Sequence, residues 1–189
     1  MRTQGSERAR GVDAQLWVWV RTDDPEAVSA LGVARALRGG EALMGLRRFR
    51  LVELRGPLPA RGELEALLAR SIQFYNPQKE ATRLRLRAAE GTPLEAGERA
   101  VRVVERDGAR RRAAERWWAA QTGQEVEVRE GVVWALRFAP GAEGAAEELA
   151  VLRERGRGLL CNPHAEEHRV AAGRVPVPWL TGGRGGDEA

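Results

Sequence analysis

Few side chains in this 189-residue chain have the chemistry of a catalytic or metal site. The two histidines, His164 and His168, are four residues apart, a spacing that would place two metal ligands on one face of a helix. Pro163 and the strand-like residues after it argue against a helix here, and no cluster of cysteine or histidine elsewhere completes a site. We therefore expect no bound metal. Cys161 could act as a nucleophile, but after Leu159-Leu160 we expect a small buried side chain.

A five-residue pattern occurs twice and includes the most suggestive carboxylates. Asn76-Pro77-Gln78-Lys79-Glu80 returns 86 positions later as Asn162-Pro163-His164-Ala165-Glu166. Paired glutamates could perform general acid–base catalysis if both approached one substrate. We expect instead that each Asn satisfies backbone groups at a helix end and that each Glu pairs with a nearby arginine. Docking on a partner protein is the second interpretation, and the candidate residues for either role are Asn76, Pro77, Glu80, Asn162, Pro163 and Glu166.

Known catalytic loops are missing from the sequence. It has no Gly-x-x-x-x-Gly-Lys-Ser/Thr loop for nucleotide phosphates and no Gly-x-Ser-x-Gly nucleophile elbow. We expect no catalytic residue and no cofactor bound by this chain.

Composition limits the class of protein. Hydrophobic residues make up 43% of the chain, yet no apolar run is long enough to span a bilayer, and Met1 to Gly11 lacks the apolar stretch of a secretory signal. One cysteine excludes an internal disulfide, which indicates a reducing compartment, so we expect a cytoplasmic protein. The net charge of +4 invites nucleic acid, but the 27 acidic residues are interspersed with the basic ones. A solvated mixed surface is the favoured interpretation of this balance, and nucleic-acid binding is the least favoured.

The elements that would position these residues follow the same order twice. Period-two and period-3.6 apolar patterns predict strands and helices, and Gly and Pro mark their ends. In the first part we expect a strand over 15–21, a helix from 25 to 37, a strand pair over 43–54, a helix with the apolar stripe Leu64, Leu67, Leu68 and Ile72, and a strand over 82–87. In the second part we expect a strand over 100–104, a helix over 108–123, a strand pair over 124–138 with a turn at Glu130-Gly131, a helix from 145 to about 160, and a strand over 168–171.

This repetition predicts an α+β fold of two tandem β-α-β-β-α-β units. Each unit would be a two-layer sandwich of ferredoxin-like build, and the two antiparallel sheets would merge through their edges. The expected divisions are a flexible leader (1–13), a first unit (14–89), a linker (90–98), a second unit (99–172) and a flexible Gly- and Pro-rich tail (173–189). We expect Trp17 and Trp19 to pack in the core on one strand face. Of Trp117 and Trp118, we expect one in the core and the other exposed at an interface; the alternative is that both are mostly covered by the second unit.

The stretch Leu159-Leu160-Cys161-Asn162-Pro163-His164-Ala165-Glu166 resembles the C-terminal signature of the PurS family. PurS is the small subunit of phosphoribosylformylglycinamidine synthase, and its signature is a Leu-Leu-x-Asn-Pro-x-x-Glu stretch at the end of the second helix. Residues 71–80 form a second, looser copy that lacks the Leu-Leu pair. The resemblance covers residues 15–87 and 100–172. PurS is usually a single unit of about half this length, so this chain resembles a tandem PurS.

The resemblance implies a non-catalytic subunit that bridges the synthetase PurL and the glutaminase PurQ and supports ammonia transfer in purine biosynthesis. ATP, Mg and glutamine would be used by those partners. A tandem chain would supply both halves of the family's homodimer as one polypeptide, a pseudo-dimer independent of protein concentration. The alternatives are a stand-alone α/β module that binds a small molecule or docks on a protein and, less favoured, an RNA-associated basic protein.

Overall fold

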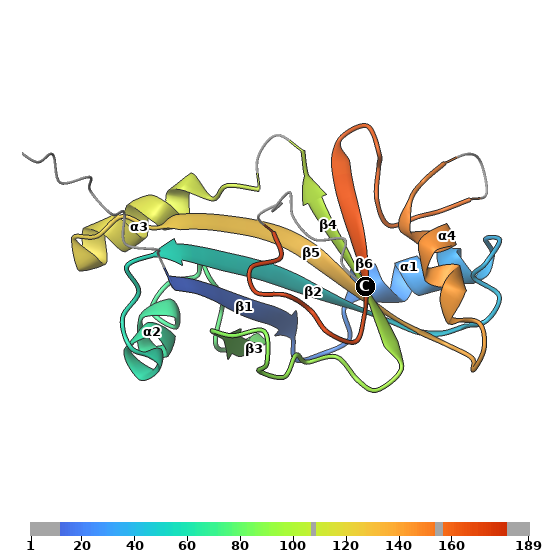
Figure 1. Cartoon of the computed structure of the whole chain (residues 1–189), viewed down its shortest axis with the longest axis horizontal. Helices are drawn as coiled ribbons and strands as arrows, with labels where there is room; N and C mark the ends of the chain where they lie inside the picture. The colour runs from blue at the N-terminus through green and yellow to red at the C-terminus, as the bar shows by residue number, and fades with distance from the viewer. Residues whose placement is uncertain (1–11, 107–108, 154–156, 181–189) are drawn as a thin grey trace, which may run out of the picture.

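One six-stranded antiparallel sheet organises the molecule (Figure 1). The computed structural model describes residues 12–106, 109–153 and 157–180. The order of strands across the sheet is β3-β1-β2-β5-β4-β6. The strands are β1 (Val12–Val20), β2 (Leu43–Gly56), β3 (Glu80–Arg85), β4 (Glu98–Glu105), β5 (Glu127–Phe138) and β6 (Glu166–Ala172). The helices are α1 (Pro25–Arg35), α2 (Arg61–Leu68), α3 (Arg112–Thr122) and α4 (Ala146–Ala150), the last preceded by the short 3-10 turn η1 (Glu143–Ala145).

The sheet consists of two three-stranded halves with the same internal order. In residues 12–85, the first half, the chain forms the order β3-β1-β2, and in residues 98–172, the second half, it forms β6-β4-β5. The halves join through β2 and β5, which pair antiparallel from Leu43 opposite Phe138 to Arg55 opposite Glu127. The α+β class and the merged antiparallel sheet are therefore as expected.

Each half contains three strands where the sequence predicted four. The expected strand pairs over 43–54 and 124–138 are the single long strands β2 and β5, and no turn occurs at Glu130-Gly131. Gly131 lies opposite Leu51 in the continuous ladder. A Cβ at this position would come within 2.8 Å of the Leu180 side chain, so glycine is needed here for a close approach from outside the sheet and not for a turn.

The helices cover one face of the sheet in two groups. Adjacent residues of a strand point to opposite faces, so β1 turns Ala14, Leu16 and Val18 toward the helices and Trp17 away from them. The groups are α2 with α3 and α1 with α4, and each contains one helix from each half (Figure 1). The two halves therefore share both of their helix-side cores.

Two predicted helices are shorter than expected. α4 ends at Ala150, because Val151 turns extended and forms a parallel bridge with Cys161. Gly158 has a φ of +74°, and a Cβ there would meet the Val151 carbonyl, so the chain returns through a glycine-dependent turn. α2 ends at Leu68, which leaves Ile72 outside the apolar stripe and 79% exposed.

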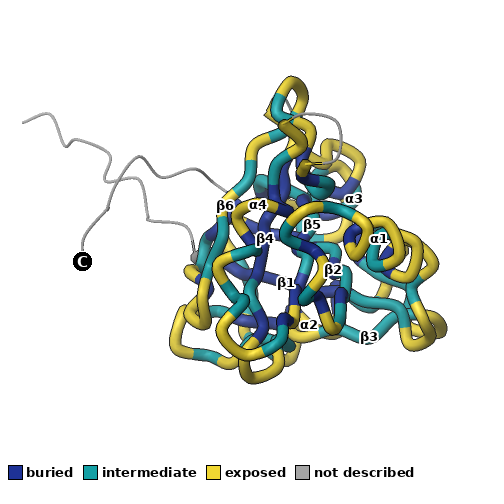
Figure 2. The backbone as a smooth tube through the Cα atoms, turned by 90° about the vertical axis from the view of Figure 1, so that its right-hand side faces the viewer, coloured by how far each residue is buried: buried dark blue, intermediate teal, exposed yellow. Residues whose placement is uncertain are grey.

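The second face of the sheet is covered by the segment 173–180, which we call the strap. It leaves β6 at one edge of the sheet and crosses in front of the inner strands (red in Figure 1). Val175, Trp179 and Leu180 are buried against Trp17, Phe49 and small side chains of the sheet. Figure 2 shows the buried strands beneath the exposed outer loops. The Gly- and Pro-rich composition predicts a flexible tail here, but packing of the apolar strap residues holds 173–180 on the sheet. The remainder of that tail lies outside the described residues, as does the leader up to residue 11.

Aromatic side chains pack as their positions in the elements require. Trp17 is fully buried and meets the Phe49 ring edge-on at 5.4 Å, while Trp19 on the same face meets Phe49 at 5.8 Å. On α3, Trp118 is fully buried and Trp117 is partly buried, and both contact Phe74 of the first half. Trp118 is thus the core member of the pair, as expected, while the partly buried Trp117 is covered in part by Phe74 of the first half.

Candidate functional site

The two Asn-Pro-x-x-Glu segments form the same hydrogen-bonded turn. In the first copy, Asn76 Oδ1 accepts from the Gln78 N–H at 3.0 Å, and the Asn76 N–H donates to the Glu80 carboxylate at 2.6 Å. The Asn76 carbonyl accepts from the N–H groups of Lys79 and Glu80. The proline after each Asn has no N–H to satisfy, so the turn leaves few backbone groups unpaired.

The second copy repeats these bonds with nearly equal lengths. Asn162 Oδ1 accepts from the His164 N–H at 3.1 Å, and the Asn162 N–H donates to Glu166 at 2.7 Å. Its carbonyl accepts from the N–H groups of Ala165 and Glu166. Each turn also receives a backbone hydrogen bond from the end of the central strand of its half, from Arg21 in the first and from Arg106 in the second. The asparagines therefore satisfy backbone groups, and each glutamate closes its own turn. The expected position at a helix end is wrong, because α2 ends at Leu68 and α4 at Ala150, well before the two turns.

The two glutamates lie too far apart to act on one bond. Glu80 begins β3 and Glu166 begins β6, which are the opposite edges of the sheet. Five strand spacings of about 4.8 Å separate these edges by roughly 24 Å. An acid–base pair needs both groups within hydrogen-bond reach of one substrate, so this geometry excludes the two glutamates as such a pair.

An arginine clamp distinguishes the first turn from the second. Arg50 donates to the Phe74 carbonyl at 2.6 Å and lies 3.5 Å from Glu80 and 3.2 Å from Glu130. Among the ion pairs of the described residues, none includes Glu166. The expected pairing of the glutamate with an arginine is thus present in the first copy. In the second copy Arg106 contacts the turn through the Pro163 carbonyl at 3.2 Å, and within the described part of the chain Glu166 binds the Asn162 N–H.

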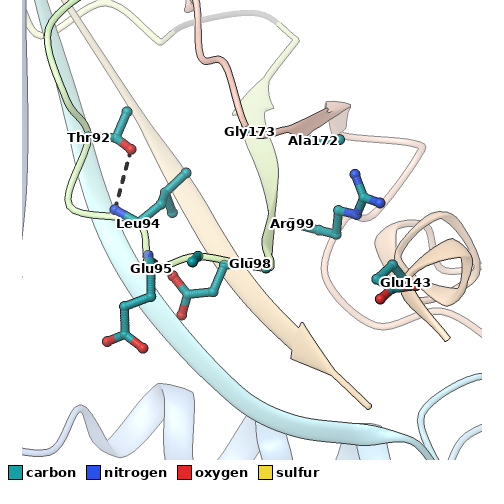
Figure 3. Close-up of a pocket in the computed structure, with 10 residues that line it drawn as sticks. Thr92, Leu94, Glu95, Glu98, Arg99, Glu143, Ala172 and Gly173 are labelled. Atoms are coloured by element: carbon teal, nitrogen blue, oxygen red, sulfur yellow. Dashed lines mark hydrogen bonds between the residues drawn. The ribbon is translucent and has the colours of Figure 1, made fainter. Parts of the chain in front are cut away.

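A cleft of about 420 Å³ opens where the connection between the halves meets the end of β6 (Figure 3). Its polar lining includes Thr92, Glu95, Glu98, Arg99 and Glu143. Glu98 is largely buried, and its carboxylate binds the Arg47 guanidinium at 2.5 Å and the Glu95 N–H at 2.7 Å. Backbone hydrogen bonds lower the pKa of Glu143, with a smaller contribution from Arg99, so this carboxylate is a poor proton acceptor. Two of the cleft's carboxylates, Glu95 and Glu98, are ion-paired, and among the described residues that line it there is no cysteine, histidine, serine or lysine.

The strap rests on a group of four buried polar residues, which we call the cradle: Gln15, Glu53, Arg85 and Arg102. Glu53 Oε1 accepts from the Trp179 N–H at 2.6 Å and Oε2 accepts from the Leu180 N–H at 2.8 Å. Two carbonyls near the beginning of the strap are also bound, Val175 by Arg85 at 3.0 Å and Pro176 by Gln15 at 3.0 Å. Arg102 donates to the Trp179 carbonyl at 2.5 Å. All five contacts go to main-chain atoms of the strap.

The cradle residues also hold one another in place. Gln15 is fully buried; its Nε2 donates to Glu53 at 2.8 Å, and its Oε1 accepts from the Trp17 indole and from Arg85. Arg102 reaches Glu167 of β6 at 2.7 Å with its other terminal nitrogen. Side chains on β1, β2 and β3 therefore form one group and those on β4 and β6 a second, and the main chain of Trp179 joins the two groups by binding Glu53 and Arg102.

Burial affects the electrostatics of the two cradle arginines. Desolvation lowers the pKa of Arg85 and of Arg102, and in Arg102 the nearby Glu167 opposes this effect. Both guanidinium groups stay protonated, because arginine does not lose its proton in proteins. Arg102 Nε has no hydrogen-bond partner in the described structure. The cradle is consequently a fixed set of donors and acceptors, suited to recognition of a peptide main chain and without a nucleophile.

The remaining candidate residues do not form a reactive site. Cys161 is buried beside α4 and Leu149, and burial raises the pKa of its thiol. His164 is exposed in the second turn and His168 lies on β6 opposite Val103. Within residues 12–106, 109–153 and 157–180, no group of three or more metal-ligating side chains comes together.

Sequence reasoning located both turns but missed the cradle. The alternation Arg83-Leu84-Arg85-Leu86-Arg87 indicated that the arginines face solvent, yet Arg85 is 1% exposed. A fully buried Arg102 was likewise hidden in the apolar run 100–104. The available signal was the pair Trp179-Leu180, an apolar pair inside a Gly- and Pro-rich segment, which needs a surface to cover it.

Comparison with known proteins identifies no relative: no family model, curated protein or solved structure matches this chain. None of the helices in the described ranges combines the length and apolar character required to cross a membrane.

Proposed function

We propose that this chain is a non-catalytic, PurS-like assembly subunit of phosphoribosylformylglycinamidine synthase. In this role it bridges the synthetase PurL and the glutaminase PurQ in the cytoplasm, and it leaves ATP, Mg and glutamine to those partners. One observation supports the proposal most: the two halves share one strand order, join through β2 and β5, and begin their outer strands with the same turn. Such a chain is a symmetric pair built from one polypeptide.

The turns are the proposed contacts with the partner subunits. Their polar groups are used internally, but the second and third residues after each Asn are exposed, namely Gln78 and Lys79 in the first and His164 and Ala165 in the second. These side chains can contact another protein without disturbing the turn, since only their backbone groups take part in it.

Reconstitution tests the proposal. The chain is mixed with PurL and PurQ of the same organism, with ADP and glutamine present, and analysed by size-exclusion chromatography with light scattering. Glutamine-dependent amidine formation is then assayed with and without the chain. The proposal predicts one chain per synthetase and an activity that requires it. Separate elution with unchanged activity would refute it and leave the alternatives of a small-molecule-binding or protein-docking module and of an RNA-associated protein.

A charge reversal in the turn tests where the partners bind. Lys79→Glu should weaken complex formation, because it places a negative charge at the proposed contact while the turn remains intact. Arg116→Glu makes the same change of charge on an exposed position of α3 and is the matched control. Equal effects of the two variants on complex formation would show that the first turn is not part of the interface.

A further inference from the structure

The strap is bound in the manner of a peptide ligand. Within the described residues it forms no main-chain hydrogen bond with a strand, so it is not part of the sheet. Its polar contacts with the sheet come from cradle side chains, which bind the carbonyls of Val175, Pro176 and Trp179 and the N–H groups of Trp179 and Leu180. Side-chain recognition of an extended main chain is a mode by which proteins bind peptides.

A face with only a structural role would be simpler to build from apolar side chains. Burying Glu53, Arg85 and Arg102 requires that each be paired, and well-packed apolar residues often serve stability as well or better. What the charged groups add is a fixed direction and register for the bound segment. In the second half the sheet face beneath the strap consists of Ala100, Ala135 and Gly131, whose small size leaves room for the strap's side chains.

The packing around Trp179 and Leu180 sets which side chains fit against the cradle face. Trp179 is 4% exposed and packs in the cluster of Trp17 and Phe49. Leu180 fills the space above Gly131, where even a Cβ would come within 2.8 Å of it. The site therefore reads an aromatic residue followed by an aliphatic one, and both need a free N–H for Glu53, which excludes proline at these two positions.

The strap has a hinge at its origin. Gly173 has a φ of +94° and no atom within 4 Å of its Cβ position, and it lies at the rim of the cleft drawn in Figure 3. Glycine adopts backbone conformations that other residues rarely adopt, so Gly173 is the position at which the strap can most readily change direction.

We propose that the cradle is a peptide-binding site, which the strap fills until a partner protein presents an extended segment of the same kind. That segment carries a proline-containing stretch followed by an aromatic–aliphatic pair, and the released strap makes room for it. The inference is independent of the synthase assignment, because it concerns a different face of the molecule from the turns.

A labelled peptide with the sequence of residues 174–181, blocked at both ends, tests this proposal by fluorescence anisotropy. Full-length protein with Trp179→Ala and Leu180→Ala has a weakened strap and should bind the peptide at least about tenfold more tightly than wild type, where the strap competes in cis. Adding Glu53→Gln or Gly131→Ala to that variant should weaken binding about tenfold. A peptide with Trp replaced by Ala is the control and should not bind.

Absence of binding to the folded double variant, or equal binding to it and to wild type, would overturn the proposal. If circular dichroism shows that the double variant does not fold, hydrogen exchange of the wild-type chain decides instead. The amides of Trp179 and Leu180 should then exchange at least about tenfold faster than those of Val132 and Val133 in β5, because they open by release of the strap. Equal protection would show that the strap is a fixed part of the core and would also overturn it.

Discussion

Replacing Glu53 with glutamine tests the anchoring of the strap with minimal change of shape. The carboxylate accepts three hydrogen bonds, from Gln15 Nε2 at 2.8 Å and from the N–H groups of Trp179 and Leu180 at 2.6 and 2.8 Å. A glutamine can keep its carbonyl oxygen on the side of Trp179. Its amide group then faces the Leu180 N–H, donor against donor, in a position that is 4% exposed.

The magnitude follows from these three bonds. A hydrogen bond to a charged group stabilises by roughly 1.5–3 kcal/mol and one between neutral groups by about 0.5–1.5 kcal/mol, while a buried unsatisfied N–H costs about 1–3 kcal/mol. Two bonds weakened by about 0.5–1 kcal/mol each and one N–H left without an acceptor give a loss of about 3 kcal/mol. For a chain of this size that loss lowers the Tm by roughly 6–12 °C.

Urea unfolding followed by tryptophan fluorescence measures this loss, with the wild type and Glu53→Gln compared at pH 7. Glu65→Gln is the matched control, because Glu65 makes an exposed i,i+4 ion pair with Arg61 at 3.5 Å and should contribute less than about 0.5 kcal/mol. If Glu53→Gln were no more destabilising than Glu65→Gln, the anchoring of the strap through its main chain would be refuted.

Three further outcomes are expected. Asn76→Ala and Asn162→Ala should each lower the free energy of unfolding by about 1 kcal/mol, because each removes one side-chain acceptor from an equivalent turn. Urea unfolding measures both losses, and a large difference between them would show that the turns are not equivalent. Burial of Glu115 acts to raise the pKa of that carboxyl, but hydrogen bonds from Arg110 and a backbone N–H outweigh burial and lower the pKa. The ionised carboxylate therefore stabilises the fold above the unfolded pKa of about 4.3, and this stabilisation is lost as the pH falls through the lower folded pKa. Glu115→Gln should therefore destabilise at pH 7 and approach wild-type stability near pH 2, as measured by unfolding across that range. Cys161 should react with a thiol reagent slowly in the native protein and quickly in urea, because it is 1% exposed and burial raises the pKa of its thiol; fast native reaction would contradict this packing.

Local pattern in the sequence was sufficient for the alternation of strand and helix regions but not for the number of strands, since strand alternation and helix periodicity act over short distances. It failed where a distant segment decides the outcome. Glu130-Gly131 has the composition of a turn, but Gly131 is required by the approach of Leu180 from 49 positions away along the chain. Arg85 has the pattern of a solvent-facing residue, but its guanidinium is enclosed by the strap and by the loop carbonyls of Ala88 and Glu90.

The candidate site likewise has one part that the sequence predicted and one part that it did not. Asn76 and Asn162 form turns with residues two to four positions away, so their backbone-satisfying role could be predicted from a short motif. The cradle joins Gln15, Glu53 and Arg85 with a segment at the other end of the sequence, and a single sequence does not reveal such a junction.

The pairing of β2 with β5 determines what happens if the chain is cleaved between its two halves. The connection between Arg85 and Glu98 runs through largely exposed residues, and a break there would separate the halves covalently while leaving every strand whole. Each fragment alone would expose the inner edge of its longest strand and half of each helix-side core. Burial of these exposed surfaces favours association of the two fragments. The fold should therefore tolerate a nick in this connection, and two separately produced fragments should reassemble through the β2–β5 pairing and the strap.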